Sequence, residues 1–221
     1  MELKGKKALF LGDSITEGAG TSGPEKRYFN LLKESAGLAE VIGYGIGGTR
    51  IAKQHLPSSN LLVDRDFCER VDEMDDTADL IVVFGGTNDY GHGNAEIGAF
   101  TDRTKDTFYG ACHVLMTKLI NKYPDAQIVF MTPLHRKGEE NPFGDCNQGT
   151  EKIYAPLKTY VEIIKEVAEY YSIPVLDLYA TSGIQPNVPI ICEKFCPDGL
   201  HPNDAGHVKI AQKLENFLKT L

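Results

Sequence analysis

Short, strongly apolar runs separated by longer amphipathic stretches constrain the fold of this chain more than any other feature of its sequence. Apolar runs of about four to eight residues are typical of strands that are buried on both faces of a parallel sheet. The runs that fit this description are Lys7–Leu11, Glu40–Tyr44, Leu80–Phe84, Gln127–Met131 and Pro174–Leu178. They predict a five-stranded sheet in the interior of the protein.

The stretches between these runs carry apolar residues at helical spacing. The pattern is clear in 105–122, in 152–171 and in the segment after Pro202, where Asn203 is suited to cap a helix. Strands that alternate with helices predict an α/β fold in which helices cover both faces of a parallel sheet. The chain has 221 residues and shows no internal repeat or linker, so we expect a single domain spanning 1–221.

Charge and hydropathy exclude some classes of partner. The formal net charge is -8, whereas proteins that bind nucleic acid present clustered positive charge, so we expect no nucleic-acid partner. The apolar stretch Ala8–Leu11 is too short for the core of a signal peptide, and no stretch reaches the length of a membrane span. These features predict a cytoplasmic protein without a membrane span.

The cysteines indicate reduced thiols. An odd number of cysteines without a signal sequence does not suggest a disulfide framework. Cys192 and Cys196 are four residues apart, but a zinc site needs more ligands at suitable spacing, so we expect no metal. Whether these two cysteines ever pair is left open by the sequence. The five cysteines are Cys68, Cys112, Cys146, Cys192 and Cys196.

Polar or glycine-rich segments follow several of the predicted strands. Gly12–Gly18 follows the first strand, Gly45–Thr49 the second and Gly85–Asp89 the third, while Asp198–Pro202 comes after the fifth strand and a long loop. In doubly wound sheets, ligands bind beyond the carboxyl ends of the strands. We therefore expect these segments to meet at one rim of the sheet and to form the functional site.

These segments resemble, in order, the sequence blocks that define SGNH (GDSL-type) hydrolases. Ser14 matches the serine of the nucleophile block, Gly48 the glycine of the second block and Asn88 the asparagine of the third, while Asp198 and His201 match the Asp-x-x-His block. The resemblance implies a three-layer α/β/α, flavodoxin-like domain with strand order 2-1-3-4-5. It also implies a serine esterase that needs no cofactor or metal.

The residues themselves can perform this chemistry. A serine hydroxyl such as that of Ser14 is a weak nucleophile until a base accepts its proton, and His201 can be that base and later the acid. Asp198 would orient the imidazole and stabilise its charged form. Attack on an ester creates an oxyanion, for which the backbone N–H groups of Ser14 and Gly48 and the side-chain amide of Asn88 are candidate donors.

The sequence departs from the family at one position and contains two misleading motifs. Gly43 stands where many relatives have asparagine, which puts one supporting contact in doubt. Gly18–Gly23 and Gly43–Gly48 match a dinucleotide-binding pattern, but neither joins a strand directly to a clean helix. Asp13 and Asp89 lie inside the family blocks, and we expect them to hold loop geometry rather than to react.

Other residues near the predicted strand ends allow two interpretations. His92, His135 and Arg136 either line the substrate site or are solvated loop residues. Tyr90 and Phe143 either form an apolar pocket wall or pack a loop.

The function that these observations predict is hydrolysis of a small-molecule carboxylic ester through an acyl-serine intermediate. A short acyl group, such as acetyl on a carbohydrate, is our first interpretation. A lysophospholipase or thioesterase is the alternative among enzymes. A catalytically inactive binding module on the same fold is the alternative from another class. The sequence leaves the oligomeric state undetermined.

Overall fold

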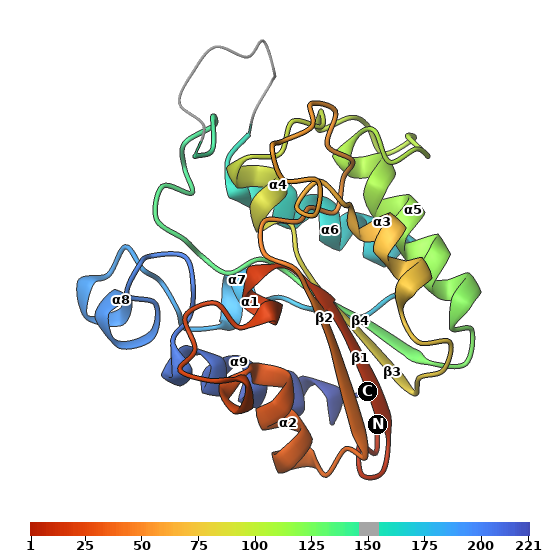
Figure 1. Ribbon diagram of the computed structural model, residues 1–221, viewed down its shortest axis with the longest axis vertical. Helices are drawn as coiled ribbons and strands as arrows, with labels where there is room; N and C mark the ends of the chain where they lie inside the picture. Colours follow the sequence, from red (N-terminus) through yellow and green to blue (C-terminus); the bar gives the residue numbers. More distant parts are fainter. Residues whose placement is uncertain (146–154) are drawn as a thin grey trace.

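A computed structural model describes residues 1–145 and 155–221 of the chain. Its centre is a parallel sheet of five strands in the order β2-β1-β3-β4-β5, which confirms the predicted fold class and strand order (Figure 1). The register places Gly12, at the end of β1, beside Gly45 of β2 and Phe84 of β3. The strands are β1 (Lys7–Gly12), β2 (Glu40–Gly45), β3 (Leu80–Phe84), β4 (Gln127–Met131) and β5 (Val175–Leu176).

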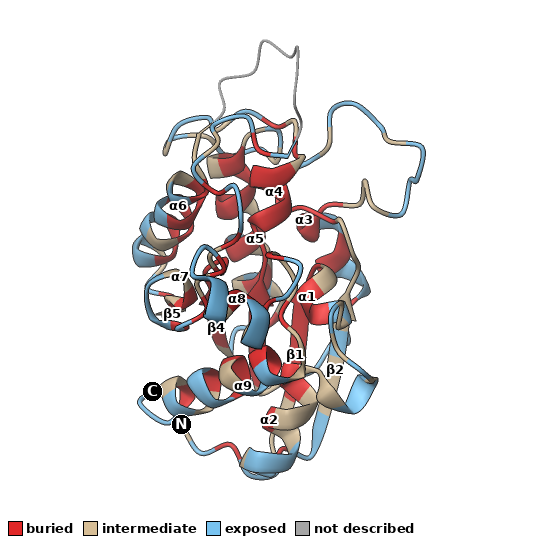
Figure 2. Ribbon diagram, turned by 90° about the vertical axis from the view of Figure 1, so that its left-hand side faces the viewer, coloured by how far each residue is buried: buried red, intermediate tan, exposed pale blue. Residues whose placement is uncertain are grey.

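Helices cover both faces of this sheet, as Figures 1 and 2 show. One face carries α3 (Phe67–Arg70), α5 (Phe108–Lys122) and α6 (Leu157–Tyr170), and the other carries α2 (Tyr28–Ala36) and α9 (Asp204–Leu218). Side chains alternate across a strand, so β1 and β3 contribute to two separate apolar clusters. Leu9 and Val83 belong to the first cluster, and Phe10 and Val82 to the second. The central strands are therefore buried on both sides, as their apolar sequences predict.

Capping side chains decide where the predicted helices begin. The helix predicted over 105–122 begins at Phe108, because the Thr107 side chain accepts a hydrogen bond from the Gly110 N–H. Asn203 caps α9 by accepting from the Gly206 N–H, as its position before the helix predicts. Residues 146–154, which include the start of the helix predicted over 152–171, lie outside the described residues.

The fifth strand is shorter than predicted. We expected it to run over Pro174–Leu178, but it ends at Leu176 and α7 (Leu178–Thr181) begins at once. Asp177 causes the change, because its side chain accepts a hydrogen bond from the Ala180 N–H and thereby starts a helix. The apolar residue Leu178 therefore belongs to a helix and not to the strand.

Several short elements, and one longer helix, were not predicted. The helix α2 was missed although Tyr28, Phe29 and Leu32 repeat at helical spacing and are buried. The other elements that the sequence analysis did not identify include α1 (Ser14–Glu17), η1 (Pro24–Lys26), η2 (Val71–Glu73), α4 (Thr87–Gly91) and α8 (Pro189–Phe195). No helix within residues 1–145 or 155–221 has both the length and the apolar character needed to cross a membrane.

Candidate active site

Ser14 is the first residue of α1, which follows β1 after a sharp turn (Figure 1). The turn is stabilised by Asp13, whose buried carboxylate accepts a hydrogen bond from the Ile15 N–H at 3.0 Å. Burial raises the pKa of Asp13 to about 6 despite that hydrogen bond. Ser14 itself is half-buried, so part of the residue remains accessible to solvent.

Ser14, His201 and Asp198 form one chain of hydrogen bonds. The Oγ atom of Ser14 lies 3.0 Å from Nε2 of His201, and Nδ1 of His201 lies 2.7 Å from Oδ2 of Asp198. A carboxylate only accepts hydrogen bonds, so Nδ1 carries the proton and Nε2 of the neutral ring faces the serine as an acceptor. The structure thus brings together three residues that are up to 187 positions apart.

Asp198 is also held by its own backbone. Its Oδ1 atom accepts hydrogen bonds from the Leu200 N–H at 2.8 Å and from the His201 N–H at 2.7 Å. Partial burial opposes the charge of this carboxylate, but the two N–H groups and the His201 ring outweigh it and lower the pKa of Asp198. The carboxylate therefore stays charged when it orients the imidazole.

The glycine-rich segment Gly18–Gly23 connects the Ser14 turn to the His201 segment. A side chain at Gly20, which has a φ of +88°, would lie 2.4 Å from the Pro202 carbonyl oxygen. The backbone N–H of Ser22 donates to Asp204 at 2.8 Å. The second glycine of a dinucleotide-like pattern, Gly20, thus allows close packing here, in a loop between α1 and η1.

The loop after β2 lies against α1. The Glu17 carboxylate accepts a hydrogen bond from the Gly47 N–H at 2.8 Å, and a Cβ atom built on Gly47 would lie 3.6 Å from Cβ of Ser14. Gly48 has a φ of +78°, which side chains rarely tolerate. The close approach of Gly47 to Ser14 and the positive φ of Gly48 explain why this loop is rich in glycine.

The segment after β3 forms α4, which is hydrogen-bonded to the loop after β2. The side-chain amide of Asn88 donates from Nδ2 to the Thr49 carbonyl oxygen at 3.0 Å. The neighbouring Asp89 accepts hydrogen bonds from the N–H groups of Ile51 and Ala52 at 2.9 Å and 2.8 Å. Asn88 is therefore held beside Gly48. Asp89 orders the residues that follow Gly48 in the same loop.

Arg70 stabilises this rim and was not identified from the sequence. Its guanidinium is buried and donates to the Gly12 carbonyl at 3.0 Å, to Thr49 Oγ1 at 2.7 Å and to the Tyr44 carbonyl. Burial lowers its pKa to about 10, so the side chain remains charged. Because an arginine among acidic residues usually belongs to a solvated helix surface, no signal in the sequence pointed to this role.

The departure from the family at Gly43 also has a structural reason. A Cβ atom at Gly43 would lie 2.5 Å from the ring of Phe29, which packs directly over the strand. A larger residue there would require the Phe29 ring to shift. Arg70 joins the carbonyl of the next residue, Tyr44, to the end of β1.

His135 and Arg136 are not solvated loop residues. Nδ1 of His135 lies 2.8 Å from the Glu139 carboxylate, and its ring packs against Tyr179. Arg136 is buried and forms an ion pair with Asp145, in which its Nη2 atom lies 2.6 Å from Oδ1 and 2.7 Å from Oδ2 of the carboxylate. Both side chains hold the loop after β4 in place.

The two aromatic candidates for a pocket wall differ from each other. Tyr90 is buried and donates its hydroxyl to the carbonyls of Gly138 and Asn141, so it packs the loop after β4. Phe143 is 55% exposed, so it could contact a ligand only from the surface.

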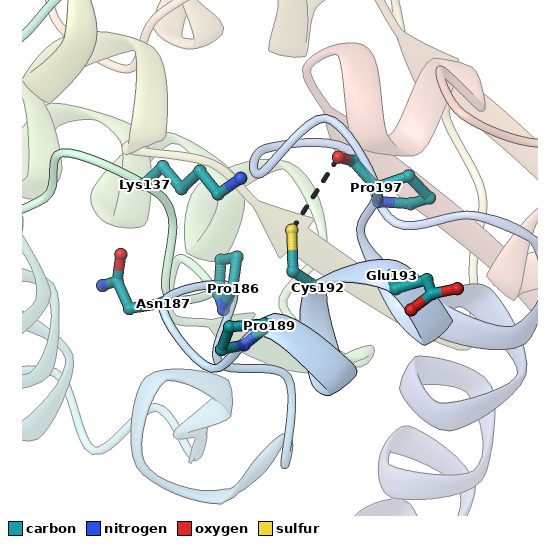
Figure 3. A pocket seen from close by; sticks show the side chains of 7 residues that line it. All are labelled: Lys137, Pro186, Asn187, Pro189, Cys192, Glu193 and Pro197. Carbon is teal, nitrogen blue, oxygen red and sulfur yellow. Dashed lines mark hydrogen bonds between the residues drawn. The ribbon is translucent and has the colours of Figure 1, made fainter.

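A cavity of about 480 Å³ lies beside the Asp198 segment, and Figure 3 shows it from close by. Lys137, which lines the cavity, contacts that segment through its backbone N–H, which donates to the Gly199 carbonyl at 2.8 Å. Ser14 and His201 are not among its lining residues. These are Lys137, Pro186, Asn187, Pro189, Cys192, Glu193 and Pro197.

The cysteines and acidic residues provide no metal site in the part of the chain that the structure describes. Cys192 and Cys196 are buried thiols, and the Cys192 thiol approaches the Cys196 carbonyl at 3.2 Å. Cys68 and Cys112 are also unpaired, and Cys146 lies outside the described residues. No group of three or more His, Cys, Asp or Glu side chains within residues 1–145 and 155–221 is arranged to hold a metal ion.

Several solved structures resemble this chain over nearly its whole length. A crystal structure of a protein from Lactobacillus plantarum is 30% identical, covers 98% of this chain and 98% of its own, and superposes with a TM-score of 0.82. A lipase/acylhydrolase from Enterococcus faecalis is 20% identical over 97% of this chain and 96% of its own, with a TM-score of 0.66. An acetyl xylan esterase is 22% identical over 95% of this chain and 98% of its own, with a TM-score of 0.64.

No curated protein matches the chain. The sequence model of the GDSL-like Lipase/Acylhydrolase family, in contrast, matches residues 10–209, which include every segment of the rim described above. The chain therefore belongs to the GDSL-like lipase/acylhydrolase family, whose members hydrolyse esters.

Proposed function

We propose that this protein is a serine esterase in which Ser14 is the nucleophile and His201 and Asp198 complete the triad. The observation that carries the proposal is the hydrogen-bonded chain from Ser14 Oγ to His201 Nε2, 3.0 Å, and from His201 Nδ1 to Asp198 Oδ2, 2.7 Å. The nucleophile, the base and the group that orients the base are all within hydrogen-bonding distance, which is the arrangement that nucleophilic catalysis requires.

The reaction follows from these positions. Ser14 Oγ attacks the carbonyl carbon of the ester while His201 Nε2 accepts the hydroxyl proton. The tetrahedral intermediate breaks the bond to the alcohol oxygen, and His201 returns the proton to the leaving alcohol. Water then attacks the acyl-serine with the same base, which releases the carboxylic acid and regenerates Ser14.

The negative charge on the carbonyl oxygen needs donors that are already in place. We assign this role to the backbone N–H groups of Ser14 and Gly48 and to the Asn88 amide. Two contacts support the assignment: Gly47 packs beside Ser14, and Asn88 is hydrogen-bonded to the residue after Gly48. Donors held by the fold lose little energy on reorganising, so they stabilise the transition state efficiently.

The substrate that we infer is an ester of a small acyl group, such as acetyl on a carbohydrate. The loops around the rim support it, because Gly18–Gly23, Gly91–Gly98 and 136–145 are rich in polar residues and glycine. A long acyl chain requires a deep apolar slot. The acetyl xylan esterase among the structural neighbours has the same fold, but a likeness of fold does not by itself identify the substrate of this chain.

One observation favours the alternative, a lysophospholipid or thioester substrate. The segment after the Gly48 loop exposes Leu56, Leu61 and Leu62 to solvent, at 66%, 72% and 51%. Val63, at the end of that segment, lies within 3.4 Å of the Cβ position of Gly48. Apolar side chains next to the rim are a surface on which a lipid chain can rest.

Labelling with a fluorophosphonate tests the proposed mechanism. The wild-type protein should be labelled once, at Ser14, and should hydrolyse p-nitrophenyl acetate. Ser14→Ala should lose both properties while keeping its melting temperature, whereas Ser22→Ala, a matched change at a serine whose hydroxyl donates to Asp204, should keep both. An unlabelled, inactive wild-type protein would indicate a binding module, and an active Ser14→Ala variant would rule out this nucleophile.

A further inference from the structure

The side chain of Asn88 is oriented by two residues that no family block contains. His92, at the carboxyl end of α4, places its Nε2 atom 3.2 Å from Asn88 Oδ1. Arg50, two residues after Gly48, places its Nη2 atom 2.8 Å from Nδ1 of the same ring. The three side chains form a continuous path from the loop after β2 to the amide of Asn88.

Only one arrangement of protons fits this path. A guanidinium can only donate, so Nδ1 of His92 must be the acceptor and the ring proton must lie on Nε2. The Nε2–H group then donates to Asn88 Oδ1, which leaves Nδ2 of Asn88 to donate to the Thr49 carbonyl at 3.0 Å. Turning the amide over would place Nδ2 against the Nε2–H group and Oδ1 against a carbonyl oxygen, two repulsive contacts.

The surroundings keep His92 in this neutral form. Burial, and then the positive charge of Arg50, lower the pKa of His92 to about 4, with Arg136 acting in the same direction and Asp145 against it. The imidazole is therefore uncharged at neutral pH, which is the state that an arginine can pair with.

Arg50 also reaches the other side of the rim. Its Nη1 atom donates to the Val63 carbonyl at 3.0 Å, and the side chain of Val63 packs at 3.4 Å from the Cβ position of Gly48. Arg50 is 5% exposed, so it makes these contacts away from solvent. One buried side chain thus holds both the residue that covers Gly48 and the residue that orients Asn88.

We propose that Arg50 and His92 are positioning residues that turn the NH₂ group of Asn88 toward the rim, where the proposed oxyanion forms. The inference rests on the proposed function, because it gives Arg50 and His92 a role only through the amide of Asn88. Neither residue contacts Ser14, His201 or Asp198 in the hydrogen bonds described. An amide free to turn would present its oxygen to the developing negative charge for part of the time, which would raise the barrier.

Replacing His92 tests the role directly. His92→Phe keeps a flat ring but removes the donor, and we expect kcat to fall by up to about 100-fold with little change in KM, as for a misplaced catalytic group. His92→Gln, which has an N–H donor near the position of Nε2, should recover most of the activity. His55→Phe is the matched control, because His55 is exposed on the loop after β2 and its ring contacts Asp106 rather than Asn88.

A double-mutant cycle separates orientation from folding. In an Asn88→Ala background, His92→Phe should leave kcat unchanged, because the amide that it orients is already gone. An equal loss of kcat in both backgrounds would overturn the inference, as would full activity of His92→Phe in the wild-type background. Retained activity of Ser14→Ala would overturn the proposed function and this inference with it, so the two failures are distinguishable.

Imidazole ¹⁵N chemical shifts provide a second measurement that does not depend on activity. His92 should show the neutral tautomer with its proton on Nε2 at pH 6 to 7. Arg50→Met removes the donor that selects this tautomer, so the ring should populate both neutral forms and kcat should fall in the same direction as in His92→Phe. A proton on Nδ1 of His92 in the wild-type protein would contradict the arrangement.

Discussion

At the scale of single residues, the site depends on side chains whose polar atoms are almost all occupied by the fold. Asp198 receives two backbone N–H groups as well as the imidazole, and Asn88 is bonded at both ends of its amide. Groups held in this way lose little conformational entropy when a substrate binds. In the proposed mechanism, the hydroxyl of Ser14 therefore needs only to pass its proton to His201.

The amide of Asn88 gives a prediction at this scale. Asn88→Ala should lower kcat by about 100–1000-fold, which corresponds to about 3–4 kcal/mol, because one of the proposed oxyanion donors is lost. KM should change much less, since the donor acts mainly in the transition state. Steady-state kinetics with p-nitrophenyl acetate measure both values. A raised KM with an unchanged kcat would instead make Asn88 a residue that binds the ground state.

At the scale of secondary-structure elements, the packing of α9 on α2 depends on a neutral histidine. His207 of α9 is fully buried, and its Nδ1 atom accepts a hydrogen bond from the Tyr28 N–H of α2 at 3.1 Å. Burial lowers the pKa of His207 to about 4 from an ordinary value of 6.5. The helix pair is therefore most stable when this ring carries no charge.

The stability of the protein should for this reason decrease in mild acid. Between about pH 6.5 and pH 4, His207 is mostly protonated in the unfolded chain and mostly neutral in the folded chain. The free energy of unfolding therefore falls as pH falls. At pH 5 the loss from this one group is about 2 kcal/mol. Above about pH 6.5 both states are neutral and the contribution is complete.

His207→Asn tests this dependence, because the asparagine oxygen can still accept from the Tyr28 N–H. The drop in the free energy of unfolding between pH 7.5 and pH 5 should be about 2 kcal/mol smaller in the variant than in the wild-type protein. Urea unfolding at the two pH values measures the difference, with His55→Asn as an exposed control. Asp13, whose raised pKa acts with the opposite sign, is present in both proteins and cancels. Identical pH dependence in the variant and the wild-type protein would exclude His207 as the cause.

At the scale of the whole molecule, the two ends of the chain lie next to each other, at the end of the sheet opposite α1 and α4 (Figures 1 and 2). The amino group of Met1 donates to the Leu218 carbonyl at 2.7 Å. Both apolar clusters share the sheet, so neither can form without it.

We propose that residues 1–221 are one domain, and expect one cooperative unfolding transition. Since the two clusters share β1 and β3, opening either one exposes the strands on which the other depends. Scanning calorimetry should give a calorimetric enthalpy equal to the van't Hoff enthalpy. Two resolved transitions would divide the chain into separate units.

The length of the preferred acyl group is also a property of the whole molecule, because loops from several parts of the chain would enclose it. We expect kcat/KM to be highest for acetyl or propionyl esters and to fall by about butyryl to hexanoyl. A deep apolar slot would instead add roughly 0.8 kcal/mol per buried methylene, and kcat/KM would rise with chain length. p-Nitrophenyl esters from two to twelve carbons measure the trend. A maximum at eight carbons or more would favour the lipid or thioester alternative.

The alternation of apolar runs and amphipathic stretches was sufficient to predict the sheet and three of its helices. Their order in the sequence and the resemblance to a known family predicted which segments meet at the rim, because parallel strands bring their carboxyl ends to one edge. Boundaries were less predictable. The end of β5 and the start of α5 depend on caps at Asp177 and Thr107, and a capping side chain acts on single hydrogen bonds that hydrophobic periodicity does not contain.

The candidate triad could be proposed from sequence because Ser14, Asp198 and His201 lie in recognisable blocks. The residues that support the site could not. Arg70 and Arg50 are single cations in segments without a motif, and their partners lie up to 58 positions away along the chain. Only the tertiary structure brings these groups within hydrogen-bonding distance and removes them from water, and burial is what turns an ordinary charged side chain into a support for the rim.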